Sequence, residues 1–338
     1  MADQMTKLDV EIPAAGQMCQ LAEDLYWFRF SLPFRLNHIN LYAFDTEDGW
    51  LLLDCGINKP SNAEQWDIML DGPLAGRLIA GIIVSHHHAD HIGYAGSLSA
   101  RTGAPIFIGQ TEYDMAHWAL SQSEENFGNV AGDAYANFGL TAETVARTRA
   151  VGNYYRSLVG DLPAVTIVEP GHEFVTRHGR WVVRFDAGHS PGHLSLTEYD
   201  RKLYIGVDFL LPRISPNISV SLRNPDGDVL AANFSYLADM TKMAPDWLVI
   251  SGHDWPYYGG AARAQALIAH HESRLAALLA PNRPLSTAEA MQELFRFELT
   301  DHEVFFASCE ARAHLNHLVT RGDMIRDVQK GVSIFTPA

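Results

Sequence analysis

SHHHADHIG, residues 85–93, places four histidines and one aspartate within six consecutive positions. It directly follows LIAGIIVS (78–85), an almost continuous apolar run that is typical of a strand covered on both faces. Alternate residues of an extended chain share one side, so H-x-H followed by D-H can present ligands to two neighbouring cations. His87 is expected to point away. The candidate ligands in this stretch are His86, His88, Asp90 and His91.

Three further stretches offer ligands after predicted strands. AGHSPGH, GVDFL and SGHDWP contribute His193, Asp208 and His253. All seven candidates then lie at or just after the C-terminal ends of predicted strands, where layered α/β proteins collect their ligands in one cleft.

In this order, the motifs resemble those of the metallo-β-lactamase superfamily over about residues 15–280, in its lactamase-beta-like and glyoxalase II-like subgroup. The resemblance implies an α/β fold, an αββα sandwich with two metals at one edge. Asp54 in LLDCG matches a buried family aspartate that orients ligands without binding metal. His189 would act near the site or stabilise the turn. The implied ligands are His86, His88 and His193 for one metal, Asp90, His91 and His253 for the other, and Asp208 bridging both.

The ligand types indicate the metal and the reaction. Imidazole and carboxylate without cysteine suit two divalent ions, zinc first, with iron or manganese as alternatives. Two such ions about 3.5–4 Å apart can lower the pKa of a shared water towards neutrality, so the expected nucleophile is a metal-bridging hydroxide. Asp90 is the catalytic candidate, because it can also orient that hydroxide or manage its proton. Serine-nucleophile and nucleotide chemistries are not expected.

The rest of the chain has the composition of a layered α/β protein. Residues 45–49, DTEDG, predict a hairpin turn, and residues 110–160 predict a helical insert that either packs on the core or caps a pocket. A long helix is predicted at 261–280. Strands are predicted at 25–32, 39–44, 50–56, 104–109, 164–170, 181–190, 194–200, 202–210, 214–220 and 246–254.

PNRP (281–284) predicts a boundary between a catalytic domain, residues 1–282, and a C-terminal domain, residues 283–338. Two predicted helices and a short hairpin there resemble the winged-helix-like domain of lactamase-beta-like hydrolases. Residues 286–338 carry eight acidic and five basic residues, and a net charge of −3 is unsuited to binding phosphates. A packing or dimerising role is expected instead, with a homodimer as the possible assembly.

Charge and composition restrict the partners. A formal net charge of −15 argues against a nucleic-acid partner. No apolar run of 18 residues predicts a membrane span, and the first residues lack the pattern of a signal peptide. Three cysteines that are distant in sequence favour a reducing cytoplasm.

A small-molecule ester, thioester or lactone is the expected substrate if aromatic side chains line the metal cleft. Three alternatives stay open: a metal-dependent ribonuclease with a basic groove, a non-haem iron oxidoreductase on the same ligands, and a non-enzymatic regulator that uses the tail. The aromatic candidates are Phe34, His38, Tyr113, Trp118, Phe127, Tyr135, Phe138, Tyr154, Tyr155 and Tyr257.

Overall fold

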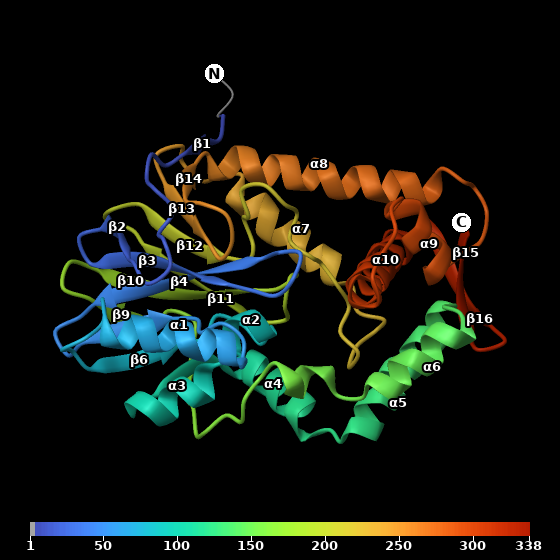
Figure 1. Cartoon of the computed structure of the whole chain (residues 1–338). Coiled ribbons are helices and arrows are strands. Elements are labelled where there is room, and N and C mark those ends of the chain that lie inside the picture. The colour runs from blue at the N-terminus through green and yellow to red at the C-terminus, as the bar shows by residue number, and fades with distance from the viewer. Residues whose placement is uncertain (1–3) are drawn as a thin grey trace.

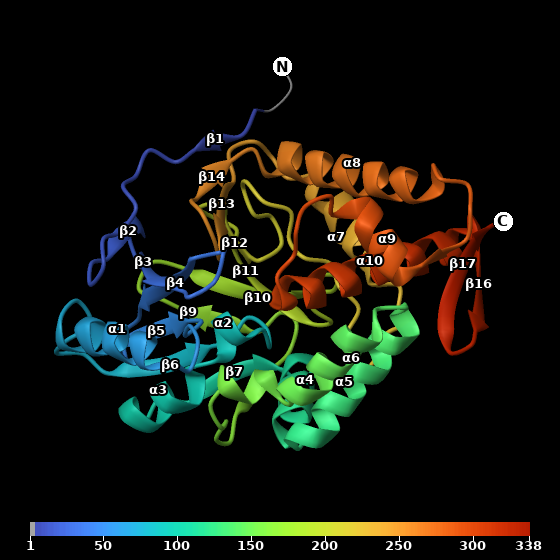
Figure 2. The same cartoon turned by 45° about the vertical axis from the view of Figure 1, so that its right-hand side comes forward.

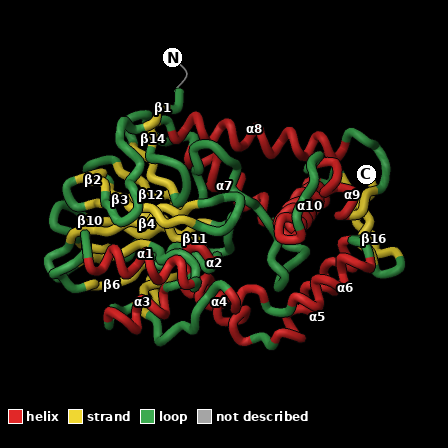
Figure 3. Tube along the Cα trace, viewed as in Figure 1, coloured by secondary structure: helices red, strands yellow, loops and turns green. Residues whose placement is uncertain are grey.

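The computed structural model describes residues 4–338. Within that range, two seven-stranded sheets pack face to face, helices cover their outer faces, and a three-stranded sheet lies near the C-terminus (Figure 1). Strands occupy the inside of the sandwich and helices its outside (Figure 3). The predicted αββα sandwich is confirmed.

The first sheet combines an antiparallel part with a parallel part. Its β3–β4–β5 segment is antiparallel, whereas β6 is parallel to both β5 and β7, as expected for a strand buried on both faces. The predicted 45–49 turn joins β4 to β5. In spatial order the strands are β2 (Cys19–Ala22), β3 (Leu25–Ser31), β4 (His38–Asp45), β5 (Trp50–Leu53), β6 (Ile79–Ile83), β7 (Ile106–Gly109) and β8 (Thr166–Val168).

The second sheet is antiparallel except for one central pair. Strands β12 and β13 run parallel, so their C-terminal ends meet at the same edge. In spatial order the strands are β1 (Thr6–Lys7), β14 (Tyr257–Tyr258), β13 (Leu248–Ser251), β12 (Leu203–Val207), β11 (His193–Glu198), β10 (Arg180–Asp186) and β9 (Glu173–Val175).

Large apolar side chains fill the space between the two sheets. Trp27 and Phe44 of the first sheet pack in one cluster with Trp181, Leu196 and Ile250 of the second, and all five are fully buried. Each such side chain contributes about 1.5–3 kcal/mol through removal from water. This core makes the sandwich a rigid support for the loops at its edges.

Helices cover both outer faces. Helices α1 (Pro60–Asp71) and α3 (Ala95–Thr102) pack on the first sheet, where Trp66 contacts the rings of Phe28 and Phe30 edge-on. Helices α7 (Val229–Met240) and α8 (Gly260–Leu279) pack on the second sheet. No helix among residues 4–338 combines the length and the apolar character needed to cross a membrane.

The predicted helical insert is present. Its helices lie beside the C-terminal domain (Figure 2). Tyr135 and Phe138 of the insert pack against Val220, Cys309 and Ala313. These two aromatic residues therefore belong to the core between the insert and the C-terminal domain, and no metal-ligand candidate is part of that cluster. The insert consists of α4 (Gln110–Ser121), α5 (Glu124–Phe138), α6 (Ala142–Val151) and a 3₁₀ turn (Tyr154–Ser157).

The C-terminal domain has the helix–helix–hairpin order of the predicted winged-helix-like unit. Capping boxes begin both helices, with Ser286 and Glu289 at the first and Thr300 and Glu303 at the second. The strand order is β15-β17-β16. Its elements are β15 (Leu285–Ser286), α9 (Thr287–Leu294), α10 (Asp301–Arg321), β16 (Met324–Gln329) and β17 (Val332–Pro337).

One helix joins the two hydrophobic cores. Ala264 and Leu267 of α8 pack on the sandwich, whereas Leu275 and Leu278 of the same helix pack in the C-terminal core. Figure 1 shows α8 running from the sandwich to the C-terminal domain without interruption. The predicted boundary at residue 282 follows this helix.

A buried arginine connects the insert to the C-terminal domain. The guanidinium of Arg312 lies between the rings of Phe138 and Phe335, at 4.8 and 5.1 Å from their centroids. It donates hydrogen bonds to Asn137 of the insert and to Ser333 of β17. Because a buried charge needs partners, this residue favours one fixed arrangement of the two parts.

The strand predicted at residues 214–220 is absent, and that prediction is wrong. Pro216 has no N–H to offer a sheet. The neighbouring backbone groups bind elsewhere: the Asn217 carbonyl faces His189, and the Val220 N–H donates to the Cys309 carbonyl at 3.3 Å. This segment instead passes between the metal-ligand candidates and α10.

Replacement of Phe138 tests the contact between the insert and the C-terminal domain. We expect Phe138→Ala to lower the free energy of unfolding by about 3–5 kcal/mol, because the ring is fully buried. Phe297→Ala is the matched control, since that ring is 55% exposed and its loss should change stability by about 0.5 kcal/mol. Urea unfolding measures both, and equal losses would contradict the packing described.

Candidate metal centre

The ligand candidates gather at one edge of the sandwich, where strands of both sheets end. His86 follows β6, Asp208 directly follows β12, and His253 follows β13. Asp90 and His91 lie on α2 (Ala89–Ile92), a single turn that redirects the chain after the strand. The predicted convergence of these loops is what the structure shows.

Three imidazole nitrogens form the first group. His86 Nε2 lies 3.0 Å from His88 Nδ1, His88 Nδ1 lies 2.9 Å from His189 Nε2, and His189 Nε2 lies 3.2 Å from His86 Nε2. Nitrogens that bind one zinc ion tetrahedrally at about 2.0–2.1 Å are about 3.3 Å apart. The triangle therefore has the size of three ligands on one cation.

The third member of this group differs from the residue expected. His189 takes the place expected for His193. His193 begins β11 and stacks on the His86 ring at 4.6 Å, while its Nε2 accepts a hydrogen bond from the Asp208 backbone N–H at 3.4 Å. His193 thus packs behind the ligand candidates rather than among them.

Asp90, His91 and His253 form the second group. Asp90 Oδ2 lies 3.6 Å from His91 Nε2 and 3.6 Å from His253 Nε2. Both histidine Nε2 atoms are buried without a hydrogen-bond partner, as is Asp208 Oδ1. Burying a polar atom without a partner costs free energy, so two unpartnered nitrogens at 3.6 Å from one carboxylate oxygen fit a bound cation.

Asp208 stands between the two groups. Its Oδ2 lies 3.5 Å from His189 Nε2, 3.5 Å from His91 Nε2 and 3.4 Å from His253 Nε2. Val207, just before it, has φ of 46°, which is uncommon for a β-branched residue. The β12–β13 register also shifts there. The strain places the Asp208 carboxylate between both groups, as the predicted bridging role requires.

Protein acceptors fix the far nitrogen of several ligand candidates. His189 Nδ1 faces the Asn217 carbonyl at 2.9 Å, and His253 Nδ1 faces the His38 carbonyl at 2.7 Å. A carbonyl only accepts, so each Nδ1 carries the hydrogen, and each Nε2 presents its lone pair to the site. Such contacts orient the rings for metal binding.

Asp54 has the supporting position that the family resemblance implied. Its Oδ2 accepts from His91 Nδ1 at 2.8 Å, and its two oxygens accept from the backbone N–H and hydroxyl of Ser85 at 2.8 Å. The Ser85 hydroxyl in turn accepts from His86 Nδ1 at 2.9 Å. One buried carboxylate therefore orients a histidine of each group.

Electrostatics divide the histidines by group. Burial, with neighbouring imidazoles, lowers the pKa of His86 and His88 well below its usual value, so both stay neutral and keep free lone pairs. Burial opposes charge on His91 as well, but Asp208, Asp90 and Asp54 raise the pKa of His91 well above the usual value. The second group thus lies in the more negative field.

Glu112 is a site residue that the sequence did not reveal. Its Oε2 accepts from the backbone N–H and Nδ1 of His87, at 2.9 and 2.5 Å. Its Oε1 accepts from the Ser190 hydroxyl at 2.8 Å and from the Gly192 N–H at 2.6 Å. This buried carboxylate on α4 ties the loop of His86 and His88 to the loop of His189.

The same contact settles the role of Ser190. GHSPG (188–192) has the G-x-S-x-G spacing of a serine nucleophile. However, the Ser190 hydroxyl is buried and donates to Glu112, and the motif joins two antiparallel strands rather than a strand and a helix. The G-x-S-x-G spacing at residues 188–192 therefore does not form the strand–turn–helix of a serine nucleophile.

Gly252 leaves space for Asp208 and His91 to lie close together. A Cβ at this position would lie 2.4 Å from Asp208 Oδ1 and 3.3 Å from His91 Cε1. Only hydrogen fits in that space, so this glycine permits Asp208 and His91 to approach each other.

Tyr257, Tyr155 and His38, three of the predicted aromatic candidates, have structural roles. The Tyr257 hydroxyl donates to the Leu210 carbonyl and its ring is buried, so it does not line a pocket. The Tyr155 hydroxyl donates to the His87 carbonyl at 2.6 Å and steadies the ligand loop. His38 Nε2 accepts from the backbone N–H of Asp254, and the Asp254 carboxylate pairs with Arg213 at 2.9 Å.

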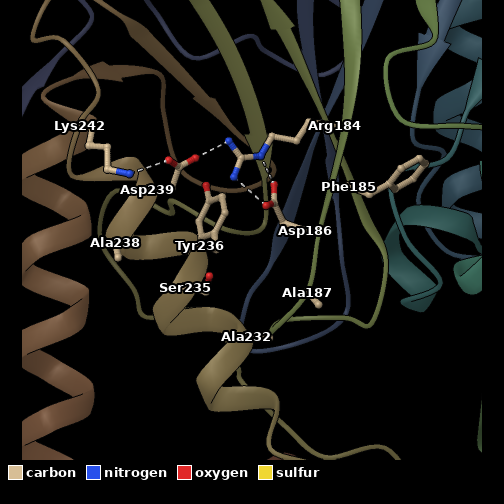
Figure 4. A pocket seen from close by; sticks show the side chains of 10 residues that line it. All are labelled: Arg184, Phe185, Asp186, Ala187, Ala232, Ser235, Tyr236, Ala238, Asp239 and Lys242. Carbon is tan, nitrogen blue, oxygen red and sulfur yellow. Dashed lines mark hydrogen bonds and ion pairs between the residues drawn. The ribbon is translucent and has the colours of Figure 1, made fainter.

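A cavity of about 580 Å³ lies beside the strand that leads to His189, but none of the ligand candidates lines it. Arg184 pairs there with both Asp186 and Asp239, and Asp239 also contacts Lys242 (Figure 4). The charged side chains that line this cavity form ion pairs with one another. The two groups of ligand candidates therefore remain the candidate metal site.

Replacing each histidine of GHSPGH in turn by alanine tests which of them is a ligand. We expect His189→Ala to lose about one tightly bound zinc per chain, because its Nε2 completes the first group. His193→Ala should retain its zinc and lose stability, because a buried ring is removed. Elemental analysis after dialysis measures the zinc content, and loss of metal from His193→Ala alone would contradict the assignment.

Glu112 predicts a pH dependence of stability. Burial would raise its pKa, but the contacts from His87 and Ser190 lower the pKa of Glu112 from 4.5 to about 2. A carboxylate with a lowered pKa stabilises the fold above pH 4.5, and this stability is lost as the pH falls towards 2. The difference corresponds to about 3 kcal/mol.

We therefore expect metal-free Glu112→Gln to be less stable than wild type at pH 7, and the difference to shrink below pH 4. Urea unfolding at pH 7, 4 and 3 measures this. Glu143→Gln is the control, because the Glu143 side chain is 80% exposed and contributes little. A Glu112→Gln difference that is constant with pH would refute the assignment.

Two known protein families match most of the sequence. The sequence matches the metallo-beta-lactamase superfamily model over residues 35–253 and the metallo-beta-lactamase-like C-terminal domain model over residues 274–338. No curated protein matches it.

Similar solved structures cover nearly the whole chain. A beta-lactamase domain protein from Burkholderia ambifaria is 31% identical, with a TM-score of 0.91 over 99% of this chain and 98% of that one. A metallo-beta-lactamase family protein from Thermus thermophilus is 24% identical, with a TM-score of 0.80 over 94% of this chain and 100% of that one. The second likeness shows the fold alone. From the family match and the first likeness together, the chain belongs to the metallo-beta-lactamase superfamily.

Proposed function

We propose that this chain is a dinuclear metal-dependent hydrolase of small esters, thioesters or lactones. The observation that carries the proposal is the position of Asp208, whose Oδ2 lies within 3.5 Å of histidine nitrogens of both ligand groups. One carboxylate shared by two adjacent groups fits a two-metal site. Members of the superfamily are generally metal-dependent hydrolases.

The donor set fits two divalent cations. The first group offers three neutral imidazoles, and the second offers two imidazoles and a carboxylate, which suits zinc in both positions. When bound, two such ions supply a hydroxide at neutral pH and polarise the attacked carbonyl.

The chain's own residues hold the site and handle the proton. The side chain of Asp90 is 23% exposed, whereas those of His91, His253 and Asp208 are at most 8% exposed. Asp90 is therefore the acidic group that substrate and water reach first. We assign to it the orientation of the nucleophile and the transfer of its proton.

We base the preference for a small uncharged or acyl substrate on the net charge of the chain and on aromatic side chains of helix α4 in the insert. A net charge of −15 for the chain disfavours polyanionic substrates. Glu112 holds the start of α4 against both ligand loops, and the aromatic residues Tyr113 and Trp118 on that helix remain partly exposed. These rings support an apolar part in the substrate.

Turnover of model substrates tests the proposal. The zinc-loaded full chain should hydrolyse members of a panel of p-nitrophenyl esters, acyl-CoA thioesters and lactones. Asp208→Ala should lower kcat/KM by more than about 100-fold, because both ligand groups lose their shared carboxylate. Asp239→Ala is the control, since its carboxylate is half-exposed and pairs with Arg184 away from the ligands.

Three results would contradict the proposal: equal turnover by chelator-treated protein, cleavage of single-stranded RNA instead of the panel, or oxygen consumption with a persulfide by iron-containing protein.

A further inference from the structure

The segment after Asp208 carries a contact between a ligand candidate and the C-terminal domain. Residues 211–220 pass from the end of β12 to α10, and Arg263 of α8 donates to the carbonyls of Leu211 and Ile214 at 2.6 and 2.8 Å. Ile218 is fully buried in the C-terminal core. The segment therefore has one end at the metal groups and the other inside a different domain.

Asn217 uses two of its groups in opposite directions. Its backbone carbonyl accepts the Nδ1 hydrogen of His189 at 2.9 Å. Its side-chain amide donates to Glu310 Oε2 on α10 at 3.1 Å. The Ser219 hydroxyl donates to the Asn217 amide oxygen and fixes the amide orientation. The imidazole of a ligand candidate is thus two hydrogen bonds away from Glu310.

Glu310 is itself held in a fixed position. Its side chain is only 9% exposed, and its Oε1 lies 3.2 Å from Arg274 of α8. The Arg274 guanidinium lies 4.5 Å from the Phe295 ring centroid of the C-terminal domain. A buried carboxylate with an arginine on one oxygen and the Asn217 amide on the other has little freedom to move.

We propose that Glu310 is a positioning residue for His189, acting through Asn217, so that the C-terminal domain sets the metal affinity of the first group. This inference rests on the proposed metal centre. Groups that orient a metal-binding histidine change metal affinity by about 10–100-fold when they are lost. Glu310 lies one step further out, and its effect depends on the hydrogen bond it accepts.

The positioning role of Glu310 can be tested without measuring activity, by titrating the full chain with zinc in competition with a chromophoric chelator. Glu310→Ala should weaken zinc binding at the first group by about tenfold, and Glu310→Gln should retain most of the wild-type affinity, because its amide oxygen still accepts from Asn217. Asn217→Ala should match Glu310→Ala, and the double variant should show no further loss.

Asn316→Ala is the matched control. Asn316 is a buried residue of the same helix, and its amide donates to the carbonyls of Pro225 and Gly227 at 3.0 Å. It holds the same connection between β12 and α7 without contacting Asn217 or His189. Its removal should cost stability and leave zinc affinity within about twofold of wild type.

The outcomes separate this inference from the proposed function. Wild-type affinity in Glu310→Ala, or an equal loss in Asn316→Ala, would overturn the role of Glu310 and leave the hydrolase proposal standing. If Glu310→Ala does not fold, unchanged affinity in Asn217→Ala overturns the inference. A wild-type chain that binds no zinc would overturn the metal centre and this inference together.

Discussion

The close approach of unprotonated imidazole nitrogens is the constraint on which the structure depends. Three of them, of which those of His86 and His189 belong to buried rings, meet within 3.2 Å at the first group, where their lone pairs repel. Such an arrangement persists only if surrounding structure enforces it. The packed sandwich, the Asp54 carboxylate and the Glu112 carboxylate supply that enforcement, each from a different element.

The sequence predicted the parts of the site that are local in the chain. H-x-H-x-D-H fixes its own geometry, because the spacing alone decides which side chains share a side. The strand ends were predicted where Asp208 and His253 lie, and the sandwich brings these ends to one edge. Hydrophobic patterning was sufficient for the longer strands of both sheets and for the main helices, but it did not predict the short strands β1, β2, β9, β14 and β15.

The predictions that failed concern residues whose positions depend on contacts between segments that are distant in the sequence. His189 and His193 have the same residue type in one short motif, and only the pairing of β10 with β11 decides that His193 points behind the site. Glu112 is one acid among many on an insert helix, and no spacing connects it to His87. The apolar pattern of residues 214–220 predicted a strand, but Ile218 and Val220 are buried instead against residues of α10.

Helix α8 has a mechanical consequence. It is 20 residues long, about 30 Å, and is embedded at one end in the sandwich and at the other in the C-terminal core. A domain that swings open needs a flexible hinge, and here the connecting element is a continuous helix instead. We therefore expect the two cores to move as one body, so that substrates reach the metal edge at the partly exposed side chain of Asp90 without a swing of the C-terminal domain.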